Sequence, residues 1–519
     1  DWSISRTAQS CGASIVTVVG AGAVTTLFAA GANRAGSGAF TQQTNRHILN
    51  KTVRSDNIRA NYTLATAVKK SLLLPLALPL VISFWLRSAF AWVDTIFASL
   101  LHSDVDGAIG DASIAAIGLA LPLDFLLTAF WVGTSNGVTA RLASAIGANR
   151  SEEVVQIKKS TYKIIFCLCS FATLTAVIVW MYAEHIGLDP VVAKQFKIYA
   201  TVMMLGSALT SFWSILPDSI VKAHYDTRST MWAGLWSSVT NLVLNALFLF
   251  VFKWGIFGIA LSTVIGRIAG FVYATIRARR LESQHLQSLK SPVLGVAANP
   301  VRKILLVAIP SSITFILMGF ESFAINGILK DTADSVSSLA AWSIFDRSVR
   351  FLTMPIIAAS VAMLPLVARL QGENKSEDIR FELLAGVRVS LIYIFVFVTP
   401  IVYFVGPLIA SALSDSAATQ LATQDVIYLV PLAILGIAPF LLSRATFDGL
   451  QRPRPALIAS GVRTFVCVIP LAVYGSINHG LFGLSQVQGI SLGYIAGLML
   501  SSLGYWLWTT KNLSRLQSR

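Results

Sequence analysis

The feature that most constrains this chain is an almost uninterrupted apolar run over residues 72–101. At 1.5 Å per residue a helix of that length is about 45 Å long, more than the hydrocarbon core of a bilayer, which is about 30 Å thick. Only Arg87 and Asp94 place charge within it. Charge inside a membrane helix is costly, so we expect both residues to face a wet cavity or to be satisfied structurally by other helices.

Similar apolar runs recur to the end of the chain. With 55% hydrophobic and 13% charged residues, the composition is that of an integral membrane protein. At about twenty apolar residues per span, we predict an all-α protein with twelve transmembrane helices. Their expected cores are 72–101, 113–138, 162–183, 198–221, 231–252, 256–276, 304–329, 339–366, 384–412, 426–443, 456–475 and 484–508.

Charge is distributed unequally between the connections. The net charge of +15 comes from short basic clusters, the largest over residues 277–303, whereas 102–111, 330–335 and 414–425 hold a single Lys. This positive-inside pattern predicts that both termini are cytoplasmic. It provides no continuous basic face, so we expect no nucleic-acid partner.

The chain also repeats itself at an offset of about 225 residues. Residues 113–119, 140–153 and 255–258 recur as 338–344, 368–378 and 480–483. Six spans per repeat give both halves one orientation, so we predict two six-helix lobes related by a pseudo-two-fold axis along the membrane normal. The expected lobes are 67–290 and 291–519, with substrate bound between them near the midplane.

Residues 1–66 differ from the rest in being rich in Ser, Thr, Ala and Gly, with few acids. We expect an N-terminal extension that is disordered or serves as a targeting segment.

No sequence motif indicates an enzyme. Hydrolase, nucleotide-binding and metal-binding patterns are lacking, and the four cysteines have no disulfide or metal spacing. We therefore predict no catalytic residue, metal or cofactor, and an ion gradient as the energy source unless transport is passive.

Polar residues inside the predicted spans are the functional candidates. Glu321 has no charged neighbour in its own helix, and a carboxylate that can be neutral or charged near physiological pH suits proton coupling. Asn241 and Asn245 lie one turn apart and share a face. We expect Arg267 and Arg463 to lie near helix ends or to snorkel. Secondary candidates are Arg87, Asp124, Asp346 and Arg350.

Several stretches resemble the multidrug and toxic compound extrusion (MATE) family of secondary transporters, in its DinF/NorM-like form. They are VDTIFASLL (93–101), IAAIGLALPL (114–123), ARLASAIGANRSEE (140–153), KAHYDTRSTM (222–231), NLVLNALFLF (241–250) and GIFGIALSTVIG (255–266). The resemblance covers about residues 70–510.

By that resemblance Asp94, Asn241, Asn245 and Thr263 form the polar cluster of the first lobe, and Glu321 is the acid of the second. The apolar stretch 437–442 stands where some members carry a further acid. The resemblance implies H⁺- or Na⁺-coupled antiport of organic, cationic or amphipathic compounds by a monomer that rocks between two states. A flippase for lipid-linked saccharides is the alternative, kept open by Arg87, Arg347 and Arg350. The expected location is a bacterial inner membrane, or an organelle envelope if residues 1–60 are a transit segment.

Overall fold

The computed structural model describes residues 3–7, 15–20, 23–28, 71–103, 107–108, 110–185, 189–288, 299–412 and 417–517. The side chains of β1–β3 and of some further positions, among them Arg87 and 89–93, lie outside this description. The chain divides into two compact units, Asp1–Lys70 and Ser71–Arg519.

The first unit contains a three-stranded antiparallel sheet. Its strands β1 (Ser3–Thr7), β2 (Ile15–Gly20) and β3 (Ala23–Phe28) pair in sequence order, with Ser3 opposite Val19 and Ile15 opposite Phe28. The prediction of a disordered or targeting extension over residues 1–66 remains a prediction.

The second unit begins with the six spans of the first lobe. They are α2 (Leu73–Ser99), α3 (Gly110–Gly147), α4 (Ser151–Tyr182) with η1 (Ala183–His185), α5 (Pro190–Gly206) with η2 (Ser207–Ser211) and α6 (Phe212–Ala223), α7 (Thr227–Ala246) with η3 (Leu247–Val251), and α8 (Gly255–Ser288). A short hairpin of β4 (His102–Ser103) and β5 (Gly107–Ala108) joins α2 to α3.

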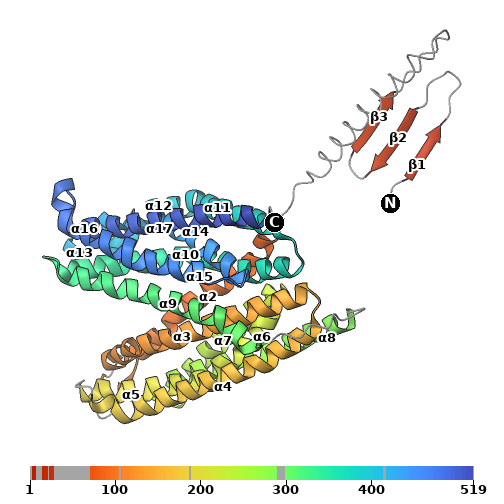
Figure 1. The fold of residues 1–519 in the computed structure, drawn as a ribbon. Helices are drawn as coiled ribbons and strands as arrows, with labels where there is room; N and C mark the ends of the chain where they lie inside the picture. Colours follow the sequence, from red (N-terminus) through yellow and green to blue (C-terminus); the bar gives the residue numbers. More distant parts are fainter. Residues whose placement is uncertain are drawn as a thin grey trace, which may run out of the picture. The chain divides into compact units, whose positions relative to one another are not determined.

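The second lobe repeats this arrangement. Its elements are α9 (Pro300–Lys330), α10 (Ser335–Gly372), α11 (Ser376–Tyr393) with η4 (Ile394–Val398) and α12 (Thr399–Ala412), α13 (Ala417–Ile427), α14 (Val430–Gly449), α15 (Arg454–Gly461) with η5 (Val462–Val468) and α16 (Ile469–Asn478), η6 (His479–Phe482), and α17 (Gln486–Gln517). Figure 1 shows α9–α17 stacked over α3–α8 as two helical layers.

The predicted fold class is confirmed. Within the described residues, eleven helices are long and apolar enough to cross a membrane, and α2, apolar over Leu73–Leu86, supplies the twelfth span. The repeat is visible in the backbone as well. Asn149 and Asn374 end α3 and α10 with positive φ angles of 55° and 60°. This left-handed conformation is a common way to end a helix, and Asn tolerates it. Both helices run several residues past their predicted apolar cores, because polar helix formers continue them up to these Asn residues.

The lobes touch at the basic end of the spans. A Cβ atom on Gly137 of α3 would lie only 2.8 Å from the carbonyl oxygen of Ile304 in α9, so the two backbones are nearly in contact. Gln451 Nε2 donates to the carbonyl of Ala140 at 3.2 Å, and the Arg369 guanidinium lies 4.7 Å from the centre of the Tyr225 ring. These contacts close the passage between the lobes at that end.

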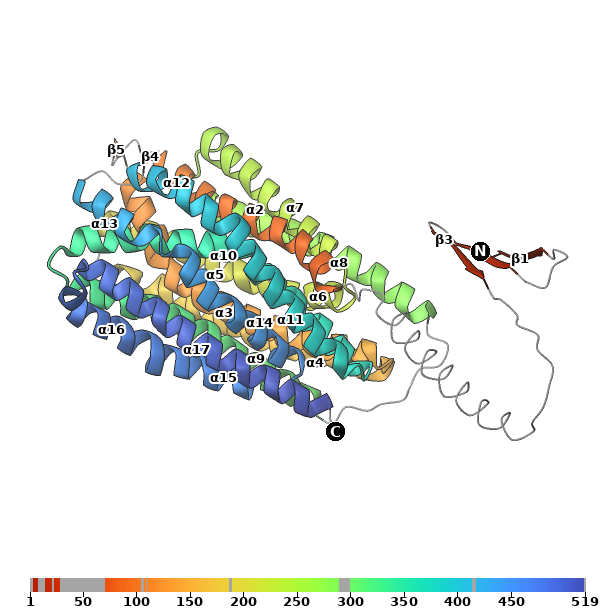
Figure 2. The same ribbon diagram turned by 90° about the horizontal axis from the view of Figure 1, so that it is seen from above.

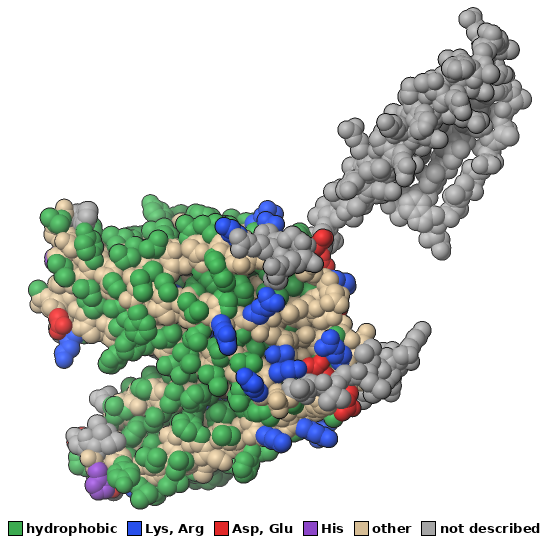
Figure 3. Space-filling view, in the orientation of Figure 1, with side chains coloured by type: hydrophobic (Ala, Val, Ile, Leu, Met, Phe, Trp, Pro, Cys, Tyr) green, Lys and Arg blue, Asp and Glu red, His purple; other side chains and the backbone are tan. Residues whose placement is uncertain are grey.

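The opposite end is open. Figure 3 shows the surface hollowed between the lobes at the end where Figure 1 places α5 and α13, while most Lys and Arg visible on this face lie toward the other end. Figure 2 places the β4–β5 hairpin and α13 together at the open end. The hollow therefore opens toward the connections that are poor in Lys and Arg.

Helix α2 belongs to both lobes. Its first half packs into the core of the second lobe, where Leu73, Ala77 and Leu80 are buried among residues of α10, α11 and α14. Glu382 of α11 caps its start by accepting hydrogen bonds from the backbone N–H groups of Leu72 and Leu73. Its second half contacts α7, in the first lobe.

Candidate functional site

Three helices of the first lobe bring their polar residues to one point. Asp94 lies near the end of α2, Asn241 and Asn245 lie one turn apart on α7, and Thr263 lies on α8. Close packing of α7 on α8 requires Gly266, because a Cβ atom there would lie 2.6 Å from the carbonyl oxygen of Ser237. The four residues that the resemblance groups together do meet in space.

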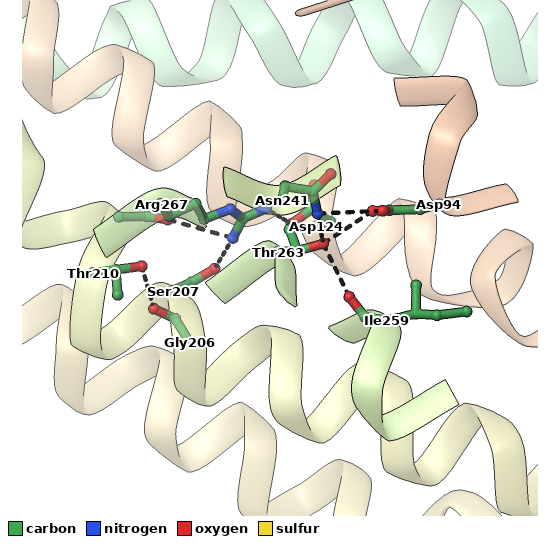
Figure 4. A network of polar contacts seen from close by, with 10 residues as sticks. Asp94, Asp124, Gly206, Ser207, Thr210, Asn241, Ile259, Thr263 and Arg267 are labelled. Atoms are coloured by element: carbon green, nitrogen blue, oxygen red, sulfur yellow. Dashed lines mark hydrogen bonds and ion pairs between the residues drawn. The ribbon is translucent and has the colours of Figure 1, made fainter. Parts of the chain in front are cut away.

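The Asp94 carboxylate accepts hydrogen bonds from neutral donors. Asn245 Nδ2 lies 2.7 Å and Asn241 Nδ2 3.4 Å from Asp94 Oδ1, and Thr263 Oγ1 lies 3.0 Å from Asp94 Oδ2. Figure 4 shows Asp94 pointing from α2 toward Asn241 and Thr263. Within the described residues no cation lies within ion-pair distance of this carboxylate. The charge of Asp94 is therefore not cancelled by a fixed cation, so the carboxylate is left to bind a proton or another cation.

Ser262 is a member of this cluster that the sequence analysis missed. Its hydroxyl is fully buried and lies 2.6 Å from Asn245 Oδ1, which orients the Asn245 amide with Nδ2 toward Asp94. The sequence could have indicated this role, since Ser262 is adjacent to Thr263 in the same predicted span. Both hydroxyls donate to the carbonyl of Ile259, which precedes them by three and four residues.

A second polar group lies one turn further along α8. Arg267 Nη2 is 3.5 Å from Asp124 Oδ1, and its Nη1 is 3.1 Å from Ser207 Oγ. Figure 4 shows the guanidinium beside its partners Ser207 and Asp124. The expectation that Arg267 lies near a helix end or snorkels is wrong, because internal partners from α3 and η2 hold it.

Glu321 of the second lobe is buried and fully paired. Its Oε2 lies 2.6 Å from Arg463 Nη2, and its Oε1 lies 2.6 Å from Thr464 Oγ1. Arg463 and Thr464 both lie in η5, a π-helical turn, a type of distortion often found at functional sites. Arg463 does lie near the start of its span, but the expectation that it snorkels is wrong, since its side chain is only 4% exposed.

A further buried pair lies in the same lobe. Arg444 Nε is 3.7 Å from Asp448 Oδ2, and Ser311 Oγ donates to the same oxygen at 2.9 Å. Arg444 and Asp448 both lie on α14 at a spacing of four residues, a spacing that places two side chains on one face of a helix and that was overlooked in the sequence.

The remaining predicted residues lie apart from the Asp94 cluster. Asp346 pairs with Arg350 in its own helix at 2.7 Å, and Arg350 also donates to Ser322 Oγ at 2.9 Å. Among the described residues, Asp346 is thus paired within its own helix and not with another one. The side chain of Arg87 lies outside the described residues.

The fold and this cluster together define a two-lobed, multi-pass membrane protein with a polar site inside its first lobe. Residues 79–247 and 310–474, more than half of the chain, match the model of the MatE family. The chain belongs to this family, is a MATE-type transport protein for small molecules, and is not an enzyme.

Individual relatives and solved structures are consistent with membership of this family. A Bacillus subtilis protein named a probable multidrug resistance protein is 23% identical over 79% of this chain and 89% of its own length. A Shewanella oneidensis protein named an FAD transporter is 21% identical over 82% of this chain and 93% of its own length. A crystal structure of a MATE transporter in the bent conformation superposes with a TM-score of 0.74 at 19% identity, covering 86% of this chain and 96% of that one.

Proposed function

We propose that this protein is a secondary antiporter that exports organic, cationic or amphipathic compounds in exchange for H⁺ or Na⁺, with Asp94 as the ion-coupling residue. The observation that carries the proposal is the Asp94 carboxylate near the end of a membrane helix, held by neutral donors and, within the described residues, without an ion-pair partner. A carboxylate inside a membrane protein is costly to retain, and proton and ion relays are the roles that such residues commonly serve.

The proton is the better supported coupling ion. The amide groups of Asn241 and Asn245 both turn Nδ2 toward Asp94, whereas a hard cation such as Na⁺ would need their oxygen atoms to face it. Thr263 Oγ1 lies within reach of both Asp94 Oδ2 and the carbonyl of Ile259, at 3.0 and 3.2 Å. The hydroxyl donates to Asp94 when the carboxylate is charged. When Asp94 carries the proton, the hydroxyl accepts from it and donates to Ile259.

Alternating access follows from the two lobes. Contacts at the basic end and a hollow at the other support an outward-open state, if the basic end is cytoplasmic as the positive-inside rule requires. Transport then needs a rocking motion that opens the basic end and closes the other. The same charge distribution supports a bacterial inner membrane location with cytoplasmic termini, and we propose a monomer.

The lipid-linked saccharide flippase receives less support. An anionic pyrophosphate needs free cations in the cavity, but Arg350 is engaged by Asp346 and Ser322. Since one relative is named an FAD transporter, FAD belongs in the substrate panel as an anionic candidate.

The test uses purified protein in liposomes that contain a pH-sensitive dye, with a fluorescent organic cation, FAD or a lipid-linked saccharide as substrate. We expect an imposed proton gradient, and not a Na⁺ gradient, to drive uptake of the organic cation, and Asp94→Asn to abolish it. Thr263→Val should reduce coupled transport strongly. Thr275→Val is the matched control, because among the described residues the Thr275 hydroxyl bonds only the carbonyl of Phe271, in its own helix. Normal proton-driven transport by Asp94→Asn would refute the assignment.

A further inference from the structure

A cavity of about 320 Å³ lies at the basic end of the first lobe, between the start of α7 and the last turns of α8. Its lining includes Arg228 and Trp232 from α7, and Tyr273, Arg277 and Arg280 from α8. It is separate from the Asp94 cluster, whose asparagines lie near the end of α7 and whose Thr263 lies near the start of α8.

The cavity carries uncompensated positive charge. Asp226 is its one acid, and that carboxylate is already engaged by Arg277 Nε at 2.6 Å and by Ser229 Oγ at 2.7 Å. Arg228 and Arg280 are exposed, and within the described residues neither guanidinium forms a hydrogen bond or an ion pair. Two guanidinium groups are thus left for an anion.

The surface that leads into the cavity is apolar. Trp232 and Ile276, both in its lining, are 45% and 50% exposed. Further exposed apolar side chains continue at helical spacing along each helix toward the middle of the span. They are Trp236, Val239 and Val243 on α7, and Ile268 and Val272 on α8. In a membrane protein such a stripe faces acyl chains, and Trp and Tyr mark the level of the headgroups.

We propose that this cavity binds the phosphate of an anionic phospholipid from the leaflet at the basic end. Arg228 and Arg280 hold the phosphate oxygens, for which the planar guanidinium group is well shaped. Trp232 and Tyr273 flank the glycerol region, and the acyl chains lie along the apolar stripes. Basic pockets between membrane helices on the cytoplasmic side are known to recognise anionic headgroups in this way.

The same chemistry would suit a soluble phosphate ester, and the apolar stripes are what favour the lipid. A soluble ester has no chains to contact Trp236 or Val272, whereas the acyl chains of a phospholipid can pack against them.

The experiment measures lipid binding to the full chain in detergent by native mass spectrometry. It compares phosphatidylglycerol, phosphatidylcholine and soluble glycerol phosphate. The test variant is Arg228→Gln with Arg280→Gln. The matched control is Arg452→Gln with Arg454→Gln, which removes two exposed guanidinium groups at the corresponding connection of the second lobe.

We expect phosphatidylglycerol to bind at least about tenfold more weakly to the test variant, with little change in the control, because each basic side chain near a membrane surface contributes to anionic lipid affinity. Phosphatidylcholine should bind weakly and equally to all variants. Equal loss in the control would mean that diffuse charge, and not this cavity, attracts the lipid. Competition by glycerol phosphate at the affinity of the lipid would overturn the lipid assignment.

Discussion

The carboxylate of Glu321 and the guanidinium of Arg463 form an ion pair of 2.6 Å whose side chains are 3% and 4% exposed. Within the described residues, Arg463 Nε and Nη1 have no hydrogen-bond partner, although the group lies 4.8 Å from the centre of the Phe440 ring. The acid predicted to couple ions in the second lobe thus already has a cation supplied by the chain itself.

Breaking this pair from one side should be costly. Arg463→Gln leaves Glu321 buried without its cation, so we expect destabilisation of about 3–5 kcal/mol. The double variant Glu321→Gln with Arg463→Gln should recover most of that loss, as measured by thermal unfolding in detergent. We also expect it to keep proton-coupled export, because Asp94 remains. A stable double variant without coupling would instead identify Glu321 as a coupling acid.

The orientation can be tested by labelling. In a background without cysteine, Ala417→Cys, at the exposed start of α13, should react from outside intact cells with a membrane-impermeant thiol reagent. Ser283→Cys, exposed on the last turns of α8, should react only after the membrane is permeabilised. The Lys and Arg distribution demands this result. The reverse pattern would place the termini on the opposite side.

The close approach at the basic end should control which side is open. Gly137→Leu cannot fit against Ile304, so we expect it to shift the population toward a state open at the basic end. A single cysteine at Ala140, covered by Gln451 in this structure, should then react several times faster from that side. Gly118→Leu is the control, since Gly118 lies on the same helix with open space around its Cα. If both variants label alike, the contact does not hold the passage closed.

Asp226 should make stability depend on pH. Burial opposes its ionisation, but hydrogen bonds from Ser229 and Arg277 outweigh burial and lower its pKa from the ordinary 3.8. A lowered pKa in the folded state gives stability that is complete above the unfolded value and is lost as the pH falls through the folded one. Wild type should therefore unfold at a higher temperature than Asp226→Asn at pH 6, with the gap closing below about pH 4. Asn still caps a helix, so the comparison isolates the charge of Asp226 beside Arg277, Arg228 and Arg280. A gap that does not change with pH would exclude this charge effect.

Much of the fold could be predicted because membrane spans are local. Apolar length alone locates the helices, and the similarity of 140–153 to 368–378 predicts the two lobes. Helical spacing alone places Asn241 and Asn245 on one face. The family resemblance then indicated that this face meets the helix of Asp94.

Lateral contacts between distant helices could not be predicted in the same way. Glu321 and Arg463 are 142 residues apart, and no spacing rule places η5 against α9. Arg463 lies near the start of its span, which favoured snorkelling, but the π-helical turn and an internal carboxylate turn it inward. The Asp346–Arg350 pair could have been predicted from the sequence, since residues four apart lie next to each other on one face of a helix.

Helix α2 is anchored at its start by Glu382, in one lobe, and carries Asp94 toward the other. Its 27 residues form a rod of about 40 Å, interrupted only by Pro79, which weakens the backbone ladder near the anchored end. When the lobes rock, such a rod cannot remain seated in both at once without bending or tilting. Any movement at the Glu382 anchor must therefore change the distance from Asp94 to Asn245, as displacing one arm of a lever displaces the other.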